Sequence, residues 1–272
     1  AREASVQVEL VQSPAWVERG EQRFPLVAGQ FLKSRDRVVT GSEARVLLRL
    51  SEGSAVKLGE NASLRMDALG EREGGVFTAA FDVARGAFRF TTGIFNRVQN
   101  RRAVNVRIAT VTAGIRGTDL WGSSDAERDL ICLIEGRITV THPEVEPVLM
   151  DAPLSFYVAP KGQVPKPVAA VDPAQLTKWA QETEMRPGGA GFSRNGAWKL
   201  SLGTVGSEAE ALAFYDRIRA AGYPARIRPQ RAGDGTYHYA LLVPQLTTRA
   251  DAEALSVRLR LDLGLDGMQV TR

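Results

Sequence analysis

The sequence has almost none of the residues on which catalysis and metal binding most often depend. Its 272 residues include one cysteine, Cys132, and two histidines, His142 and His238. A single thiol cannot form an internal disulfide, and so few thiols and imidazoles make a Cys-His nucleophile or a zinc cluster implausible. The usual serine-nucleophile, zinc-protease and phosphate-loop motifs are missing as well. We therefore expect a protein that is not an enzyme and that uses no metal and no cofactor.

Long apolar runs and a strong charge of either sign are also missing. No stretch approaches the roughly 20 apolar residues of a membrane helix, so we expect no membrane insertion. The formal net charge is only +4, a mild bias toward an anionic polymer that falls far short of a nucleic-acid-binding patch. We therefore expect no nucleic-acid partner.

The segment from 194 to 272 repeats one unit, a strand followed by a helix and a second strand. The strands Trp198–Gly203 and Tyr237–Val243 lead to helix starts at Ser207 and Thr248. Each of these cap residues is followed three positions later by an acidic residue, the spacing of a capping box. The pattern predicts a βαββαβ domain of the α+β, ferredoxin-like kind.

Such a domain covers one face of its sheet with two helices and leaves the other face bare. Alternation along the strands directs the apolar residues of Trp198–Gly203 and Tyr237–Val243 toward the helices. The polar residues expected on the bare face are Lys199, Ser201, Arg226, Arg228 and His238. They can form a shallow binding surface rich in hydrogen-bond donors, or they are solvated residues on an unused face, as is common in antiparallel sheets.

This segment resembles the sporulation-related repeat (SPOR) domain. The resemblance is carried by Trp198-Lys-Leu-Ser-Leu-Gly-Thr-Val205, Gly222-Tyr-Pro-Ala225, Tyr239-Ala-Leu-Leu-Val-Pro244 and Thr248-Arg-Ala-Asp-Ala-Glu-Ala-Leu255. It implies a periplasmic module that binds peptidoglycan and prefers glycan strands stripped of their stem peptides. Three sheet positions depart from the family pattern: a Gln falls on Ser201, a Ser on Thr204 and an Arg on Ala240. With Thr204 and Ala240 added, the candidate glycan-binding residues are Lys199, Ser201, Thr204, Arg226, Arg228, His238 and Ala240.

Residues 1–158 form a different kind of domain. Short runs of alternating apolar and polar residues are separated by Gly, Asn, Asp and Ser, as where Arg45–Leu50 turns at Ser51–Ser54 into Ala55–Leu58. This spacing predicts many short strands. The domain is therefore expected to be all-β, and a sandwich, a jelly roll and a short solenoid all remain open.

The same region resembles the FecR-type domain. The resemblance is carried by Val38–Gly41, Ser51–Ser54, Val111-Thr-Ala-Gly-Ile-Arg-Gly-Thr-Asp-Leu120 and Ile134–Val140. It implies a periplasmic domain, which in some members of the family relays a receptor signal to a sigma factor through a membrane helix. No such helix is found in this sequence, so we do not expect the relay function.

The Arg116-Gly117-Thr118 motif within this region is expected to be structural. A Gly beside a polar pair in a strand usually marks a bulge or a close approach of another backbone. Arg116 is then expected to pair with a nearby carboxylate, and ligand contact is the alternative.

Between the two domains lies a segment rich in proline and glycine. Ala159–Pro167 cannot form interior sheet or helix, Asp172 caps a short helix, and Arg186–Gly191 contains three glycines. We predict an all-β domain at 1–158, a linker with a short helix at 159–193 and a SPOR-like domain at 194–272.

Together these features predict an exported, periplasmic cell-envelope protein. The chain begins at Ala1 rather than Met, from which we expect that a signal peptide has been removed. The SPOR-like domain is expected to dock on peptidoglycan glycan strands, with the FecR-like domain as a scaffold or interaction module. The alternative is a regulatory or assembly protein whose SPOR-like sheet binds an envelope protein instead of glycan.

Overall fold

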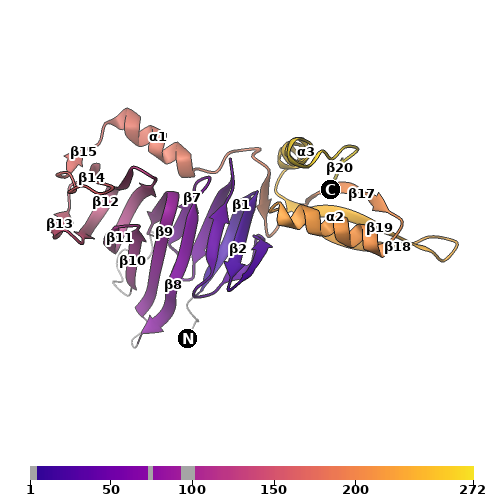
Figure 1. Cartoon of the computed structure of the whole chain (residues 1–272), viewed down its shortest axis with the longest axis horizontal. Helices are drawn as coiled ribbons and strands as arrows, with labels where there is room; N and C mark the ends of the chain where they lie inside the picture. Colours follow the sequence, from indigo (N-terminus) through magenta and orange to yellow (C-terminus); the bar gives the residue numbers. More distant parts are fainter. Residues whose placement is uncertain (1–4, 73–75, 93–101) are drawn as a thin grey trace.

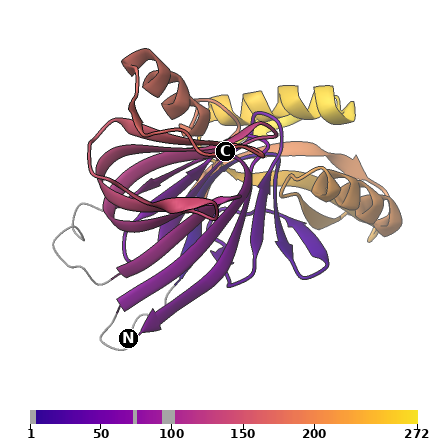
Figure 2. The same ribbon diagram turned by 60° about the vertical axis from the view of Figure 1, so that its left-hand side comes forward.

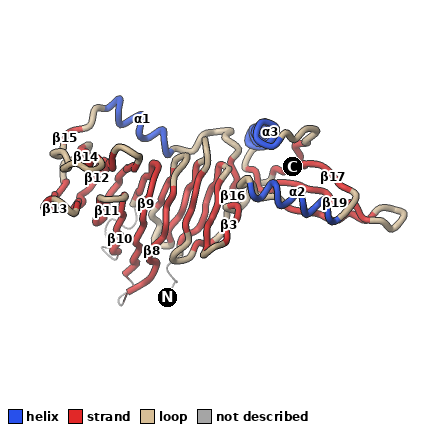
Figure 3. The backbone as a smooth tube through the Cα atoms, viewed as in Figure 1, coloured by secondary structure: helices blue, strands red, loops and turns tan. Residues whose placement is uncertain are grey.

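The computed structural model describes residues 5–72, 76–92 and 102–272 (Figure 1). Its N-terminal part consists of strands, and its C-terminal part combines strands with two helices (Figure 3). The predicted fold class, an all-β domain followed by an α+β domain, is confirmed. The strands of the first part, called the β domain here, are β1 (Val6–Gln12), β2 (Ala15–Arg19), β3 (Gln22–Pro25), β4 (Phe31–Leu32), β5 (Arg37–Thr40), β6 (Arg45–Leu50), β7 (Ala55–Leu58), β8 (Ser63–Arg72), β9 (Val76–Thr91), β10 (Arg102–Ile108), β11 (Val111–Ser124), β12 (Arg128–His142), β13 (Val145–Met150) and β14 (Ser155–Pro160).

Strand pairing arranges the β domain in two layers. The first layer follows the order β1, β6, β7, second half of β9, second half of β11, first half of β12, β14. The second layer follows the order β3, β2, β5, β8, first half of β9, β10, first half of β11, second half of β12, β13. The buried side chains of both layers form one hydrophobic core. Of the three architectures left open by the sequence, the chain adopts a sandwich whose longest strands bend from one layer to the other (Figure 2).

Glycines lie at these bends. Gly86 in β9, Gly117 in β11 and Gly136 in β12 have φ values of 81°, 62° and 97°, in the region that favours glycine. At Gly117 the pairing with β12 slips between Arg116 and Asp119, as at a bulge. A Cβ atom on Gly136 would lie 2.5 Å from the carbonyl oxygen of Gly117, so the two bends are in contact. The backbone of Arg116 belongs to β11, but its side chain lies outside the described part of the chain.

The segment predicted as a linker packs against the β domain. It contains β15 (Ala169–Ala170), α1 (Pro173–Thr183) and β16 (Gly191–Ser193). Helix α1 begins after Asp172, whose carboxylate accepts a hydrogen bond from the Ala174 amide at 2.7 Å. It lies on the outer face of the first layer, where the ring of Trp179 stacks on Trp121 at 5.1 Å between centroids.

The C-terminal domain contains β17 (Trp198–Val205), α2 (Glu208–Ala220), β18 (Arg226–Arg231), β19 (Tyr237–Leu246), α3 (Arg249–Leu263) and β20 (Gln269–Thr271). Its antiparallel sheet has the order β18, β19, β17, β20, the ferredoxin-like order. Both helices begin where predicted, because the Ser207 hydroxyl accepts from the Glu210 amide and Thr248 forms a capping box with Asp251. Helix α3 ends at Gly264, which is left-handed with φ 65°.

Both helices pack on the same face of this sheet. Their buried residues and those of the strands form a second core, which includes Leu200, Leu241 and Val243 of the sheet, Ile218 of α2 and Leu255 of α3. The buried apolar residues of α3, Ala252, Leu255 and Leu259, lie along the side of the helix that faces the sheet. The opposite face of the sheet carries neither helix.

Strand β16 connects the two domains. It pairs with β1 through three residues, and its central residue, Phe192, also pairs with Leu246 at the end of β19. The indole N–H of Trp16 donates to the carbonyl of Ala220 at 3.2 Å, and the Arg258 guanidinium donates to the carbonyl of Ser13 and forms an ion pair with Glu43. The C-terminal domain is therefore docked on one edge of the β domain.

Candidate functional site

The helix-free face of the C-terminal sheet brings the predicted glycan-binding residues together. Cross-strand pairing sets them in rows, because residues directly opposite in an antiparallel pair share a face. Across β18, β19, β17 and β20, one row consists of Arg226, Leu242, Ser201 and Gln269. Across β18, β19 and β17, a second row consists of Arg228, Ala240 and Thr204. Two further pairs flank these rows: Gln230 with His238 and Lys199 with Thr271. All seven predicted residues thus lie on this surface, called the open face here.

A bulge in β17 adjusts the register of the open face. The pairing with β19 shifts between Ser201 and Gly203, and Gly203 has φ 136°. The shift returns Thr204 to the same face as Ser201, three positions earlier, where simple alternation from Ser201 would direct it toward the helices. The residue matched by sequence to the family's Ser therefore joins the open face only because of this bulge.

Basic side chains dominate the charge of the open face. Arg226 and Arg228 follow one another along β18, and both are exposed. Lys199 donates to the main-chain carbonyl oxygen of Arg272 at 3.3 Å. Among the residues that the structure describes, no carboxylate forms an ion pair with Arg226 or Arg228, so both guanidinium groups are available to a ligand.

Sequence reasoning did not include three members of the open face. Gln230, Gln269 and Thr271 add polar groups around the predicted residues. Leu242, which the alternation of β19 places on this face, is 8% exposed near the centre. Extending the alternation of Arg226 and Arg228 by two more residues along β18 would have identified Gln230. The register of the short strand β20 depends on pairing with β17, which the sequence does not reveal.

The groups most often used in catalysis are held apart or buried. Burial raises the pKa of the Cys132 thiol to about 12, which keeps it protonated at neutral pH. His142 lies in β12 and His238 in β19, in different domains. Within the described ranges, no group of three or more His, Cys, Asp or Glu side chains is arranged to hold a metal ion. None of the helices in these ranges is long and apolar enough to cross a membrane.

Two family models match the chain. The model described as FecR protein matches residues 36–139, and the SPOR domain model matches residues 195–271. The chain joins a FecR domain to a SPOR domain. Both are binding or regulatory domains, and SPOR domains generally bind peptidoglycan and occur in cell-envelope proteins.

Two solved structures are similar in part. Both are crystal structures of a putative anti-sigma factor from Parabacteroides distasonis ATCC 8503, at 1.65 and 2.50 Å resolution. The first is 11% identical with a TM-score of 0.44 and covers 74% of this chain and 96% of its own. The second is 12% identical with a TM-score of 0.44 and covers 84% of this chain and 91% of its own. A similarity at this level carries no argument about function. The comparison with curated proteins finds no match.

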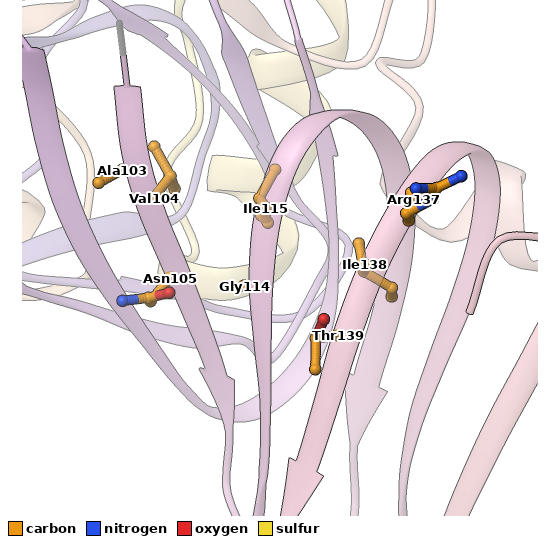
Figure 4. A pocket seen from close by; sticks show the side chains of 8 residues that line it. All are labelled: Ala103, Val104, Asn105, Gly114, Ile115, Arg137, Ile138 and Thr139. Carbon is orange, nitrogen blue, oxygen red and sulfur yellow. The ribbon is translucent and has the colours of Figure 1, made fainter. Parts of the chain in front are cut away.

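The FecR domain has a depression on the outer face of its second layer. Gly114 of β11 has no side chain, and Asn105 of β10 and Thr139 of β12 flank it, as Figure 4 shows. The cavity measures about 450 Å³. Arg137 contributes the one charged side chain of its described lining. With one charged and few polar side chains in its lining, this depression is a poorer candidate site than the open face of the SPOR domain.

Proposed function

We propose that the chain is an exported, periplasmic protein that docks on the glycan strands of peptidoglycan through the open face of its SPOR domain. The FecR domain then serves as the scaffold on which the SPOR domain is mounted. The proposed contact residues are Lys199, Ser201, Thr204, Arg226, Arg228, His238 and Ala240.

The observation that carries this proposal is the pair of unpaired cations beside a polar row. Arg226 lies directly across Leu242 from Ser201, and Arg228 lies across Ala240 from Thr204. A glycan strand offers hydroxyl and carbonyl oxygens along its length, and such groups need donors on a shallow surface. Guanidinium groups and hydroxyls spaced along neighbouring strands supply those donors.

The replacement of the family's Arg by Ala240 is compatible with this function. Ala240 lies between Arg228 and Thr204 in one row. The short side chain leaves space above the sheet, and the guanidinium of Arg228 on the adjacent strand brings a positive charge to the same row. We infer that Arg228 takes over the electrostatic contribution of the missing arginine.

The FecR domain holds the SPOR domain in one orientation. The joint combines β16, the Trp16–Ala220 hydrogen bond and the Arg258–Glu43 ion pair. These contacts involve α2, α3 and β16, which leaves the open face free. We infer a scaffold role for the FecR domain and a purely structural role for Arg116, Gly117 and Thr118.

Co-sedimentation of the full chain with purified sacculi tests the proposal. We expect the chain to pellet with sacculi, and we expect glycan strands freed of stem peptides to compete better than intact muropeptides. If the folded chain stays in the supernatant at both low and moderate salt, the proposal that it binds glycan is wrong. The open face would then be assigned to an envelope protein partner.

A further inference from the structure

A polar cavity lies between helix α1 and the first layer of the FecR domain, beside the stacked rings of Trp121 and Trp179. It measures about 250 Å³ and lies apart from the open face of the SPOR domain. Its walls include Arg45 from β6, Trp121 from β11, Trp179 and Glu182 from α1, and Glu60 from the turn after β7. A single water occupies about 30 Å³, so the cavity has room for a small organic molecule.

Arg45 is the unusual member of this cavity. Its side chain is only 2% exposed, and one of its terminal nitrogens, Nη1, donates to the Ala44 carbonyl at 2.8 Å. Its Nε has no hydrogen-bond partner, and no carboxylate of the described residues forms an ion pair with it. Burial together with the nearby charge of Arg186 lowers the pKa of this guanidinium. A buried cation without an ion-pair partner is destabilising, so its retention calls for a functional explanation.

A second donor in the same wall is also unsatisfied. The Nε1 of Trp121 is buried without a hydrogen-bond partner, although the ring itself is stacked on Trp179. Buried polar groups are normally paired. Arg45 Nε and Trp121 Nε1 are thus two buried donors, in residues that line one cavity, that have no acceptor among the described residues.

Carboxylates line the same cavity. Glu60 and Glu182 both interact electrostatically with Arg45, but neither reaches it as an ion pair. The cavity wall therefore carries two guanidinium groups, those of Arg45 and Arg128, and three carboxylates, those of Glu60, Asp125 and Glu182. None of these carboxylates forms an ion pair with Arg45. A simple anion would be attracted by Arg45 and repelled by these carboxylates. A molecule with a negative and a positive end satisfies both.

We propose that this cavity is a binding site for a small zwitterion, an α-amino acid. Its carboxylate accepts hydrogen bonds from the Arg45 guanidinium, with the Trp121 N–H as a further donor, and its ammonium group faces Glu60 and Glu182. The volume is below the range usual for drug-sized ligands, which matches a molecule of this size. Because Glu182 belongs to α1, the ligand bridges the helix and the sheet.

Thermal denaturation of the full chain with glycine, L-alanine, D-alanine and L-glutamate tests the proposal. We expect at least one of them to raise the melting temperature in a saturable way, because a ligand that binds only the folded state stabilises it. Acetate and methylamine each carry half of the zwitterion, and at the same concentration they are expected to shift the melting temperature much less. Calorimetric titration of the active amino acid should give one site per chain.

Variants identify the cavity as the site. Arg45→Met should abolish the ligand-induced shift while the unliganded variant melts no lower than the wild type, because an unpaired buried charge has been removed. Arg49→Met is the matched control, since Arg49 lies on the same strand but is exposed and paired with Glu9. Glu182→Gln, a change at the exposed side of the cavity, should weaken binding by several-fold and keeps the test decisive if Arg45→Met fails to fold.

Three results would overturn the proposal. The first is that no amino acid shifts the melting temperature, which would leave only water in the cavity. The second is that acetate alone reproduces the shift, which would make the site a plain anion site. The third is that Glu182→Gln or Arg45→Met binds the amino acid as well as the wild type does.

Discussion

Single residues with unusual backbone conformations fix the shape of the FecR domain. Gly117 and Gly136 allow two adjacent strands to turn from one layer to the other at the same height, with their backbones in close approach. Next to Gly117, the Thr118 amide donates to the Thr92 hydroxyl at 3.1 Å, and the Thr92 amide donates to the Thr118 carbonyl. The motif is thus surrounded by backbone contacts that leave little freedom for another conformation.

Gly117→Val should destabilise the protein by about 1–3 kcal/mol or more, because a β-branched residue is strained at a φ of 62°. The free energy of unfolding from urea titration measures the effect. Glu127→Gln, at an exposed position, is the control and should be near neutral. Equal unfolding midpoints for Gly117→Val and the wild type would contradict the structural role of this motif.

At the scale of elements, helix α1 shows how a short polar helix is held in place. It contributes Trp179, which stacks on Trp121 and meets Phe156 edge-on at 5.8 Å. Just beyond its end, Glu184 accepts hydrogen bonds from Lys57 at 2.7 Å and from Arg89 at 3.2 Å. An aromatic contact and a charged contact thus attach α1 to the first layer.

Trp179→Ala should cost about 3–5 kcal/mol, because a large buried ring is removed from this packing. We also expect faster amide hydrogen exchange throughout α1, which local detachment of the helix would cause. The exposed Thr177→Ala change on the same helix is the control. Unchanged exchange in α1 of the Trp179 variant would show that the ring does not hold the helix.

The sequence predicts the elements of the SPOR domain well because their signals are local. Ser207 and Thr248 with their acidic partners define the helix starts, and strand alternation assigns Lys199, Ser201 and Arg226 to one face. Pairings between segments that are distant in the chain cannot be predicted from such local signals. The pairing of β16 with both β1 and β19 and the stacking of Trp121 on Trp179 depend on contacts between residues far apart in the chain. The burial of Arg45 without an ion pair to any described carboxylate depends on such contacts as well. The bends of β9, β11 and β12 likewise depend on two layers packing together, so the sequence left the β architecture open.

At the scale of the whole molecule, the two domains share hydrogen bonds across β16. Phe192 is 2% exposed and lies between Val11 and Leu246, one from each domain. Inter-domain joints held only by a linker allow independent motion, whereas a shared strand and a buried aromatic ring resist it. We therefore expect the FecR and SPOR domains to unfold together.

Scanning calorimetry checks this expectation. The wild type should show one cooperative transition, and Phe192→Ala should lower it and separate it into two, since the variant loses about 3–5 kcal/mol at the joint. Leu261→Ala on the exposed side of α3 is the control. Two well-separated transitions in the wild type would mean that the domains are independent.

The affinity of the full chain for sacculi, compared among three arginine variants, tests the central claim most directly. Arg226→Ala and Arg228→Ala each remove an unpaired cation from the open face, whereas Arg249→Ala removes an exposed arginine of α3 that pairs with Glu253. A hydrogen bond from a charged donor to a ligand is worth about 1.5–3 kcal/mol, so the first two variants should bind roughly ten-fold or more weakly without a change in melting temperature. Arg249→Ala should bind as the wild type does. If all three variants bind sacculi equally well, the open face is not where this protein holds glycan.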